Sequence, residues 1–143
     1  MYEKVLYPTD FSEASRKALP YLLGLKGAGL KEVVLLHVVD RREIDVLTPY
    51  SPYLEKDPVK IMFQRAEEDA RTMATELEEG GITVKVRLEE GVPFEEILRV
   101  EEEEDVSLVI LGSHGKSAIE RMLLGSVSEK VVRKSKRPVL IVR

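Results

Sequence analysis

Five short apolar runs alternate along the chain with longer segments of helical periodicity, and this alternation constrains the fold more than any other feature. Three of the five runs, the second, fourth and fifth in the order given next, are almost continuously apolar, which is typical of parallel strands covered on both faces. The runs are KVLYPT (4–9), EVVLLHVV (32–39), ITVKVRL (82–88), VSLVILG (106–112) and PVLIV (138–142). They predict an α/β fold, an open parallel sheet with right-handed crossovers and helices on both faces.

The segments between the runs predict four helices, over 12–26, 58–79, 93–104 and 126–135. Pro93 suits the first turn of its helix, and Ser126 with Glu129 forms a Ser-x-x-Glu capping box at the start of the last one. The third run alternates apolar and polar residues, which predicts a more exposed strand. Residues 40–57 show no periodicity, and three prolines fall within ten residues if the next residue is included (49, 52 and 58), which is typical of a lid or a mobile connection.

Composition excludes several classes of protein. A length of 143 residues predicts one domain, 1–143, and a net charge of −4 argues against a general nucleic-acid-binding surface. The chain has no cysteine, so thiolate metal sites and cysteine nucleophiles are excluded. No apolar stretch approaches ~18 residues and no signal-peptide pattern is present, so we expect a cytoplasmic protein that does not enter membranes. The chain lacks asparagine and has a single glutamine, which favours a thermophilic source.

The stretch GSHGKSAIERMLLGS (112–126) raises the question of a phosphate-binding loop. A P-loop would need a glycine at position 110, which is Ile110, so that motif is excluded. Gly112 and Gly115 nevertheless follow a buried strand, where they permit positive φ angles and close approach of an anion to the backbone. Gly125 and Ser126 lie at a helix N-terminus, which favours phosphate. The alternative is that these glycines are ordinary turn and boundary residues.

Other polar residues near the strand ends have two interpretations each. Asp10 follows the first strand and is either an N-cap or turn residue, forming a capping box with Glu13, or a carboxylate that contacts ribose or a metal. His37 fits a packed strand position. His114 and Lys116 could reach a phosphate or face water. No G-x-S-x-G, H-E-x-x-H or complete G-x-G-x-x-G motif is present, so the sequence offers places to hold phosphate without clear machinery to transfer it.

Three segments carry a family resemblance: KVLYPTDFSEAS, VVLLHVVD and VSLVILGSHGKSAIERMLLGSVSEKVVRKSKRPVLIV. Together they resemble the universal stress protein family over essentially the whole chain. The spacing G-x2-G-x9-G-[ST] of its nucleotide-binding branch is matched without a gap. The resemblance implies a Rossmann-like sheet, similar to adenine nucleotide α-hydrolases, with strand order 3-2-1-4-5 and ATP, together with Mg²⁺, at the strand ends. The residues implied to bind the nucleotide are Pro8, Asp10, Val38, Gly112, Ser113, His114, Gly115, Gly125, Ser126, Val127 and Ser128.

In this implied site Pro8 shapes the turn, Asp10 contacts the ribose, and the backbone of Val38 contacts the adenine. The resemblance also implies a homodimer through the last strand, 138–142, whose apolar edge would otherwise be exposed. Our hypothesis is therefore an ATP-binding regulatory protein in which the nucleotide alters 40–57 and hence the binding of a protein partner. The alternatives are a slow ATPase or nucleotidyl or phosphoryl transferase that uses Asp10 and Mg²⁺, and a structural dimer with an empty site.

Overall fold

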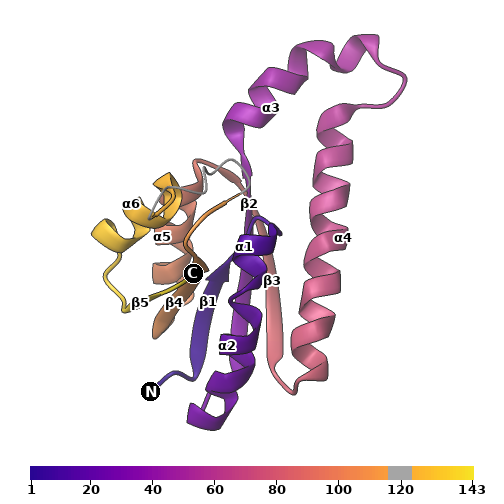
Figure 1. Cartoon of the computed structure of the whole chain (residues 1–143). Coiled ribbons are helices and arrows are strands. Elements are labelled where there is room, and N and C mark those ends of the chain that lie inside the picture. Colours follow the sequence, from indigo (N-terminus) through magenta and orange to yellow (C-terminus); the bar gives the residue numbers. More distant parts are fainter. Residues whose placement is uncertain (116–123) are drawn as a thin grey trace.

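The computed structural model describes residues 1–115 and 124–143, and within these ranges five parallel strands form one sheet (Figure 1). Its order, β3-β2-β1-β4-β5, confirms the order that the family resemblance implies. Lys116 lies outside the described residues. The strands are β1 (Lys4–Pro8), β2 (Glu32–Asp40), β3 (Thr83–Gly91), β4 (Leu108–Gly112) and β5 (Val139–Val142).

Helices fill the connections between the strands. The α-helices are α1 (Glu13–Arg16), α2 (Leu19–Leu25), α3 (Arg41–Leu47), α4 (Pro58–Glu79), α5 (Pro93–Glu103) and α6 (Ser126–Lys134), with 3-10 helices η1 (Lys26–Ala28) and η2 (Thr48–Tyr53). The prediction of one helix over 12–26 is wrong, because α1 ends at Arg16 and α2 begins at Leu19. The reason is Pro20, which has no N–H and whose ring clashes with the carbonyl four residues earlier.

Residues 40–57 were not among the predicted helical segments, yet α3 and η2 occupy most of this stretch. The carboxylate of Asp40 caps α3 by accepting a hydrogen bond from the N–H of Arg42 at 2.9 Å. Asp57 caps α4 in the same way, accepting from Val59 at 3.0 Å. Pro49 lies in the first turn of η2, where a missing N–H has little cost. Short helices of this kind leave no periodic signal.

The sheet separates two layers of apolar side chains, because successive residues of a strand point to opposite faces. On one face Val5 and Tyr7 of β1 pack with residues of α2 and α4. On the other face Leu6 packs with residues of α5 and α6, which Figure 1 shows on the opposite side of the sheet. β3 and β5 are the edge strands, and Val86 of β3 is 38% exposed, which confirms the exposed third strand.

One carboxylate at the end of α5 has an unusual number of basic neighbours. Glu104 is buried, and its carboxylate lies 2.7 Å from Lys85 Nζ, 3.0 Å from Lys4 Nζ and 3.3 Å from a guanidinium nitrogen of Arg87. Hydrogen bonds from Lys85 and then Lys4 outweigh desolvation and lower the pKa of Glu104 to about 2. These contacts join α5 to β1 and to the edge strand β3.

In residues 1–115 and 124–143, no helix combines the length and apolar character needed to cross a membrane.

Candidate functional site

Asp10 lies in the turn between β1 and α1, at the carboxyl end of the sheet. Its Oδ1 accepts a hydrogen bond from the N–H of Ser12 at 3.0 Å. Ser12, not Asp10, is the N-cap of α1, and its hydroxyl accepts from the N–H of Ser15. The predicted capping box of Asp10 and Glu13 is therefore wrong, whereas the turn position of Asp10 is confirmed. Ser12 lies three residues before Ser15, which is the spacing at which an N-cap hydroxyl accepts a hydrogen bond from the backbone, so Ser12 takes the capping role instead of Asp10.

A buried network of hydroxyl groups holds this turn in place. The Tyr7 hydroxyl donates to the carbonyl of Ser15 at 2.6 Å, and the hydroxyls of Thr9 and Ser15 lie 2.7 Å apart. Thr9 Oγ1 also accepts from the N–H of Phe11 at 3.0 Å. Burial raises the pKa of Tyr7, so its hydroxyl remains a donor well above neutral pH. Sequence reasoning missed these residues, although hydroxyl side chains directly after a buried strand were a visible signal.

His37 joins the same turn from the neighbouring strand. Its Nδ1 lies 2.8 Å from the carbonyl oxygen of Thr9, and its ring centroid lies 4.7 Å from that of Phe11. Phe11 has a φ of 62°, in the left-handed region that bulky residues rarely adopt. The predicted packing role of His37 is confirmed, but the histidine also supports the backbone of the turn that carries Asp10.

Val38 presents its backbone to the space beyond the end of β1. Leu36 accepts a hydrogen bond from the N–H of Thr9, so its backbone faces β1. Backbone groups two residues apart on a strand face the same neighbour, so Val38 faces this side as well. β1 ends at Pro8, which pairs with Leu36 in register. The main chain of Val38 therefore lies at the open edge above the turn of Asp10.

The end of β4 and the start of α6 are held together by hydrogen bonds. The N–H of Gly125 donates to the carbonyl of Ser113 at 2.6 Å, and the hydroxyl of Ser128 donates to the carbonyl of Gly112 at 2.8 Å. Ser113 also donates through its N–H to Val142 of β5, and its hydroxyl lies 2.6 Å from Nδ1 of His114. The two halves of the motif, Gly112 with Gly115 and Gly125 with Ser126, are thus brought to one place.

Asp10 lies against the same place. A Cβ atom at Gly115 would lie 2.7 Å from Oδ2 of Asp10, and one at Gly125 would lie 3.2 Å from the carbonyl oxygen of Ser113. Gly112 and Gly115, at which the sequence permitted positive φ angles, do not adopt them, and neither does Gly125. Their small size is required by close approach instead. We call the region formed by residues 10, 112–115 and 125–128 the mouth.

The first turn of α6 brings to the mouth backbone donors that have no acceptor in the part of the chain that the structure describes. Gly125 is the N-cap and makes no side-chain cap hydrogen bond, so the predicted capping box of Ser126 and Glu129 is wrong. The Ser128 hydroxyl, which could have competed for a cap, is bonded to Gly112. Among the described residues, the N–H groups of Ser126, Val127 and Ser128 have no hydrogen-bond acceptor. A helix N-terminus of this kind carries roughly half a positive charge.

Gly112 is required for packing as well as for the mouth. A Cβ at this position would lie 2.9 Å from both the carbonyl oxygen of Ala14 and the Cα of Ser15, which are backbone atoms that cannot move independently. We expect Gly112→Ala to lower the free energy of unfolding by about 2 kcal/mol, the usual cost of overpacking. Urea denaturation measures this loss. Gly27→Ala, whose Cβ meets nothing within 4 Å, should lose far less stability, and equal losses would contradict the packing argument.

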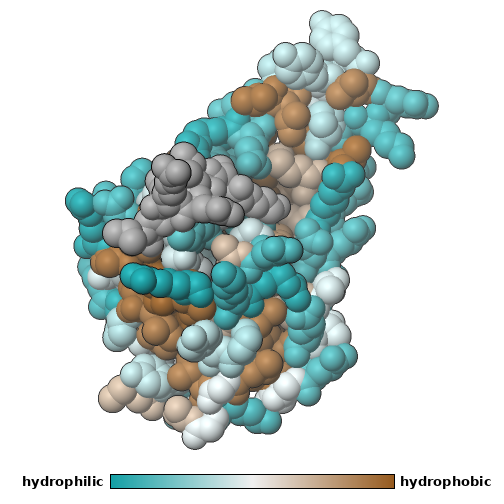
Figure 2. Space-filling view, in the orientation of Figure 1, coloured by the Kyte–Doolittle hydropathy of each residue, from teal (hydrophilic) through white to brown (hydrophobic). Residues whose placement is uncertain are grey.

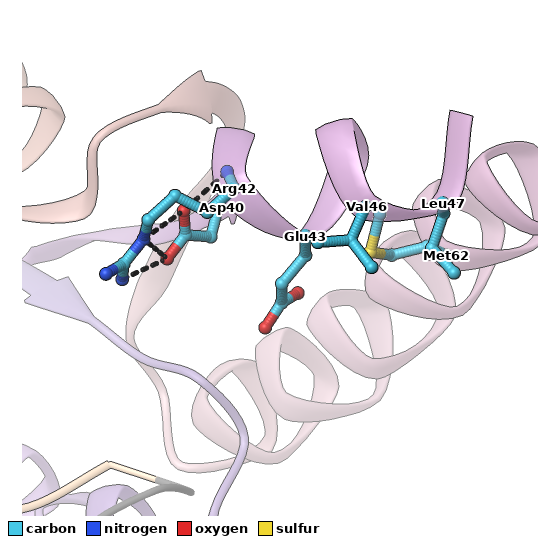
Figure 3. A pocket seen from close by; sticks show the side chains of 6 residues that line it. All are labelled: Asp40, Arg42, Glu43, Val46, Leu47 and Met62. Carbon is cyan, nitrogen blue, oxygen red and sulfur yellow. Dashed lines mark hydrogen bonds and ion pairs between the residues drawn. The ribbon is translucent and has the colours of Figure 1, made fainter. Parts of the chain in front are cut away.

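Metal ligands are sparse in this part of the molecule. Residues 1–115 and 124–143 contain no cluster of three or more histidine, aspartate or glutamate side chains that could hold a metal ion. An open hollow lies elsewhere, along α3 and facing α4, and is lined by Asp40, Arg42, Glu43, Val46, Leu47 and Met62 (Figure 3).

Comparison with known proteins identifies the family. The model of the universal stress protein family matches residues 1–143. The chain belongs to the universal stress protein family. This universal stress protein is 39% identical over 155 aligned residues to universal stress protein MJ0577 of Methanocaldococcus jannaschii, with 100% of the chain and 96% of that protein covered. A solved structure of MJ0577, from work that assigned its biochemical function from structure, matches with a TM-score of 0.89 and 42% identity, covering 99% and 96% of the two chains.

Two more distant solved structures share the fold of this universal stress protein. One is a universal stress protein in complex with cAMP, with a TM-score of 0.61 and 22% identity over 99% of this chain and 97% of the other. The second is the universal stress protein from Archaeoglobus fulgidus in complex with dAMP, with a TM-score of 0.65 and 15% identity over 100% and 98%.

Proposed function

We propose that this universal stress protein binds ATP, together with Mg²⁺, at the mouth. The observation that carries the proposal is the set of N–H groups at the N-terminus of α6 that have no acceptor within 1–115 and 124–143, placed beside Gly115 and Gly125. Main-chain donors and a helix dipole are what a phosphate chain requires. The complexes of two fold relatives with cAMP and dAMP support an adenine nucleotide as the ligand class.

The assignments are those that the family resemblance implies, and the closeness of Asp10 to Gly115 and of Ser113 to Gly125 supports them. Gly112, Gly115, Gly125, Ser126 and Val127 would approach the phosphates through their backbone, with Ser113, His114 and Ser128 beside them. Asp10 would accept hydrogen bonds from the ribose hydroxyls, the backbone of Val38 would contact the adenine, and Pro8 would set the turn that carries Asp10. Mg²⁺ commonly binds through phosphate oxygens and one or two carboxylates, and Asp10 is the carboxylate beside Gly115.

The proposed role of ATP is regulatory. Val38 is separated by one residue from Asp40, whose carboxylate caps α3 and pairs with the Arg42 guanidinium at 2.7 Å. A nucleotide that contacts Val38 would therefore act directly on the base of α3 and change how a protein partner binds to 40–57. The homodimer through β5 also remains a proposal. It is supported by the position of β5 at the sheet edge and by the exposed side chain of Leu140.

The direct experiment is to purify the protein without added nucleotide, denature it and identify any released nucleotide by mass spectrometry. Calorimetric titration of the nucleotide-free protein with ATP and Mg²⁺ then gives the affinity and stoichiometry. We expect one ATP per chain. A preparation that contains no nucleotide and gives no binding heat with any adenine nucleotide would overturn the proposal. The same samples, assayed for phosphate release, measure whether any hydrolysis accompanies binding.

A further inference from the structure

The hydrogen-bond ladder between β1 and β2 ends at Thr9, the residue that follows β1. The N–H of Thr9 donates to the carbonyl of Leu36 at 2.9 Å, as it would in a regular parallel ladder. In such a ladder the carbonyl of the same residue accepts from the N–H two residues further along the neighbouring strand, which here is Val38. Within residues 1–115 and 124–143 that second hydrogen bond does not form.

The side chain of His37 takes the place of the missing main-chain donor. Its Nδ1 lies 2.8 Å from the carbonyl oxygen of Thr9. A carbonyl oxygen can only accept, so Nδ1 carries the proton in this contact. Thr9 is therefore bound to β2 through both of its main-chain polar groups, by the carbonyl of Leu36 and by the imidazole of His37. Because the imidazole occupies the Thr9 carbonyl, the ladder ends before Val38.

The same histidine contacts both residues that flank Asp10. The Thr9 carbonyl belongs to the peptide group that joins Thr9 to Asp10, and the imidazole ring packs on Phe11 with 4.7 Å between the ring centroids. Phe11 has a left-handed backbone, with a φ of 62°, and a strained conformation of this kind persists only where the surroundings hold it. Asp10 is thus held between two residues that His37 contacts.

The main chain of Val38 is left open at this end of the sheet. Its N–H and carbonyl face the side of β1, as those of Leu36 do, and β1 supplies no partner for them in the described residues. After Val38 the chain enters α3, and Figure 2 shows the helices that follow projecting at the top of the molecule. A base whose Watson–Crick edge carries a donor beside an acceptor would pair with Val38 as a neighbouring strand does.

We infer that His37 is a positioning residue of the nucleotide site, an inference that rests on the proposed function. By taking the Thr9 carbonyl, the imidazole fixes the turn that presents the Asp10 carboxylate to the ribose. It also leaves the main chain of Val38 open for the adenine. One side chain thereby sets both the base contact and the ribose contact, whereas the phosphates are held separately by the first turn of α6.

Two substitutions separate the hydrogen bond of His37 from its ring. His37→Phe keeps a ring that can pack on Phe11 but has no donor for Thr9. His37→Asn has no ring, but its amide N–H lies close to the position of Nδ1 and can still donate. We therefore expect His37→Phe to disturb the turn, and His37→Asn to retain it.

Amide hydrogen exchange of the nucleotide-free protein, followed by NMR, measures the state of the turn. In His37→Phe the amides of Phe11 and Ser12, which donate to Thr9 Oγ1 and Asp10 Oδ1, should exchange at least tenfold faster than in wild type. The amide of Val38 should exchange at least tenfold more slowly, because the vacated Thr9 carbonyl becomes its acceptor. A general loss of structure only raises exchange rates, so slower exchange at Val38 is specific to the inferred role.

Calorimetric titration in the presence of Mg²⁺ gives the second readout. His37→Phe should bind ATP at least tenfold more weakly than wild type, because the ribose and adenine contacts are both weakened. Inorganic tripolyphosphate has neither base nor ribose, so its affinity should stay within twofold of the wild-type value. His37→Asn should bind ATP within threefold of wild type. An equal loss of ATP and tripolyphosphate affinity in His37→Phe would overturn the inference.

Val86→Phe is the matched control, because it adds the same ring to the edge strand β3, where the side chain is partly exposed. It should leave ATP affinity and the exchange of all three amides at wild-type values. The inference is overturned if His37→Phe leaves Phe11 and Ser12 unchanged, if Val38 gains no protection, or if His37→Asn does not retain the turn. The exchange measurements need no nucleotide, so a wild-type protein that binds no ATP would overturn the proposed function alone.

Discussion

Gly115→Val is expected to weaken ATP binding by at least about 100-fold, a loss of roughly 2.7 kcal/mol. The first added carbon would lie 2.7 Å from Oδ2 of Asp10, so the carboxylate must leave its position. The valine methyl groups would also occupy space in which the phosphates would approach the N-terminus of α6. Calorimetric titration of the nucleotide-free variant with ATP and Mg²⁺ measures the effect.

The control for this prediction is Gly24→Val in α2. A Cβ at Gly24 meets nothing within 4 Å, so the variant adds the same side chain without touching the mouth. Its ATP affinity should match that of wild type. Unchanged affinity in Gly115→Val, with both variants folded by circular dichroism, would show that ATP does not bind between Asp10 and α6.

Glu104→Gln should lower the free energy of unfolding by about 3 kcal/mol at neutral pH. The buried carboxylate interacts with Lys85, Lys4 and Arg87, and an uncharged amide would leave the two lysines without their counter-charge, whereas Arg87 would keep Glu89 and Glu103. The lowered pKa gives a similar magnitude, because a fall from 4.5 to about 2 corresponds to roughly 3 kcal/mol. Urea denaturation at pH 7 measures the loss.

The pH dependence of Glu104 has a definite sign. Because its pKa is lower in the folded than in the unfolded chain, its contribution is complete above about pH 4.5 and is lost as the pH falls towards 2. The wild-type protein should therefore lose more stability between these pH values than Glu104→Gln does. The control is Glu102→Gln, an exposed side chain without an ion pair among the described residues. Parallel acid profiles for wild type and Glu104→Gln would contradict the argument.

The arrangement of the sheet could be predicted because it depends on long apolar runs. Such runs identify the buried strands β2 and β4, but the expectation that 138–142 is covered on both faces is wrong, because β5 lies at the sheet edge with Leu140 exposed. Alternation of polar residues in 82–88 correctly indicated a more exposed strand, β3. The family resemblance supplied the strand order. Helix boundaries were harder, because Pro20 divides the first helical segment and the short α3 and η2 depend on caps at Asp40 and Asp57. Local hydrogen bonds of this kind have no periodicity to detect.

The sequence predicted which residues belong to the site, but not the hydrogen bonds that hold these residues in place. The motif spacing placed Gly115 and Gly125 together, the family resemblance added Asp10, and the structure brings the three residues to one mouth. The caps were assigned incorrectly because several polar side chains compete over three or four residues, and only tertiary packing decides which one succeeds. Ser128 shows this, since its hydroxyl bonds to Gly112 on another element. The contact of His37 with Thr9 crosses between strands and cannot be read from local sequence.

The left-handed backbone of Phe11 has a consequence for how this chain can vary. Such a conformation costs about 1–3 kcal/mol for a residue other than glycine. Glycine would relieve that strain but would remove the ring that packs on His37. Replacing Phe11 with glycine would therefore relax the backbone but remove the ring that packs on the imidazole of His37. The turn that carries Asp10 would then become more flexible, although the site needs this carboxylate in a fixed position.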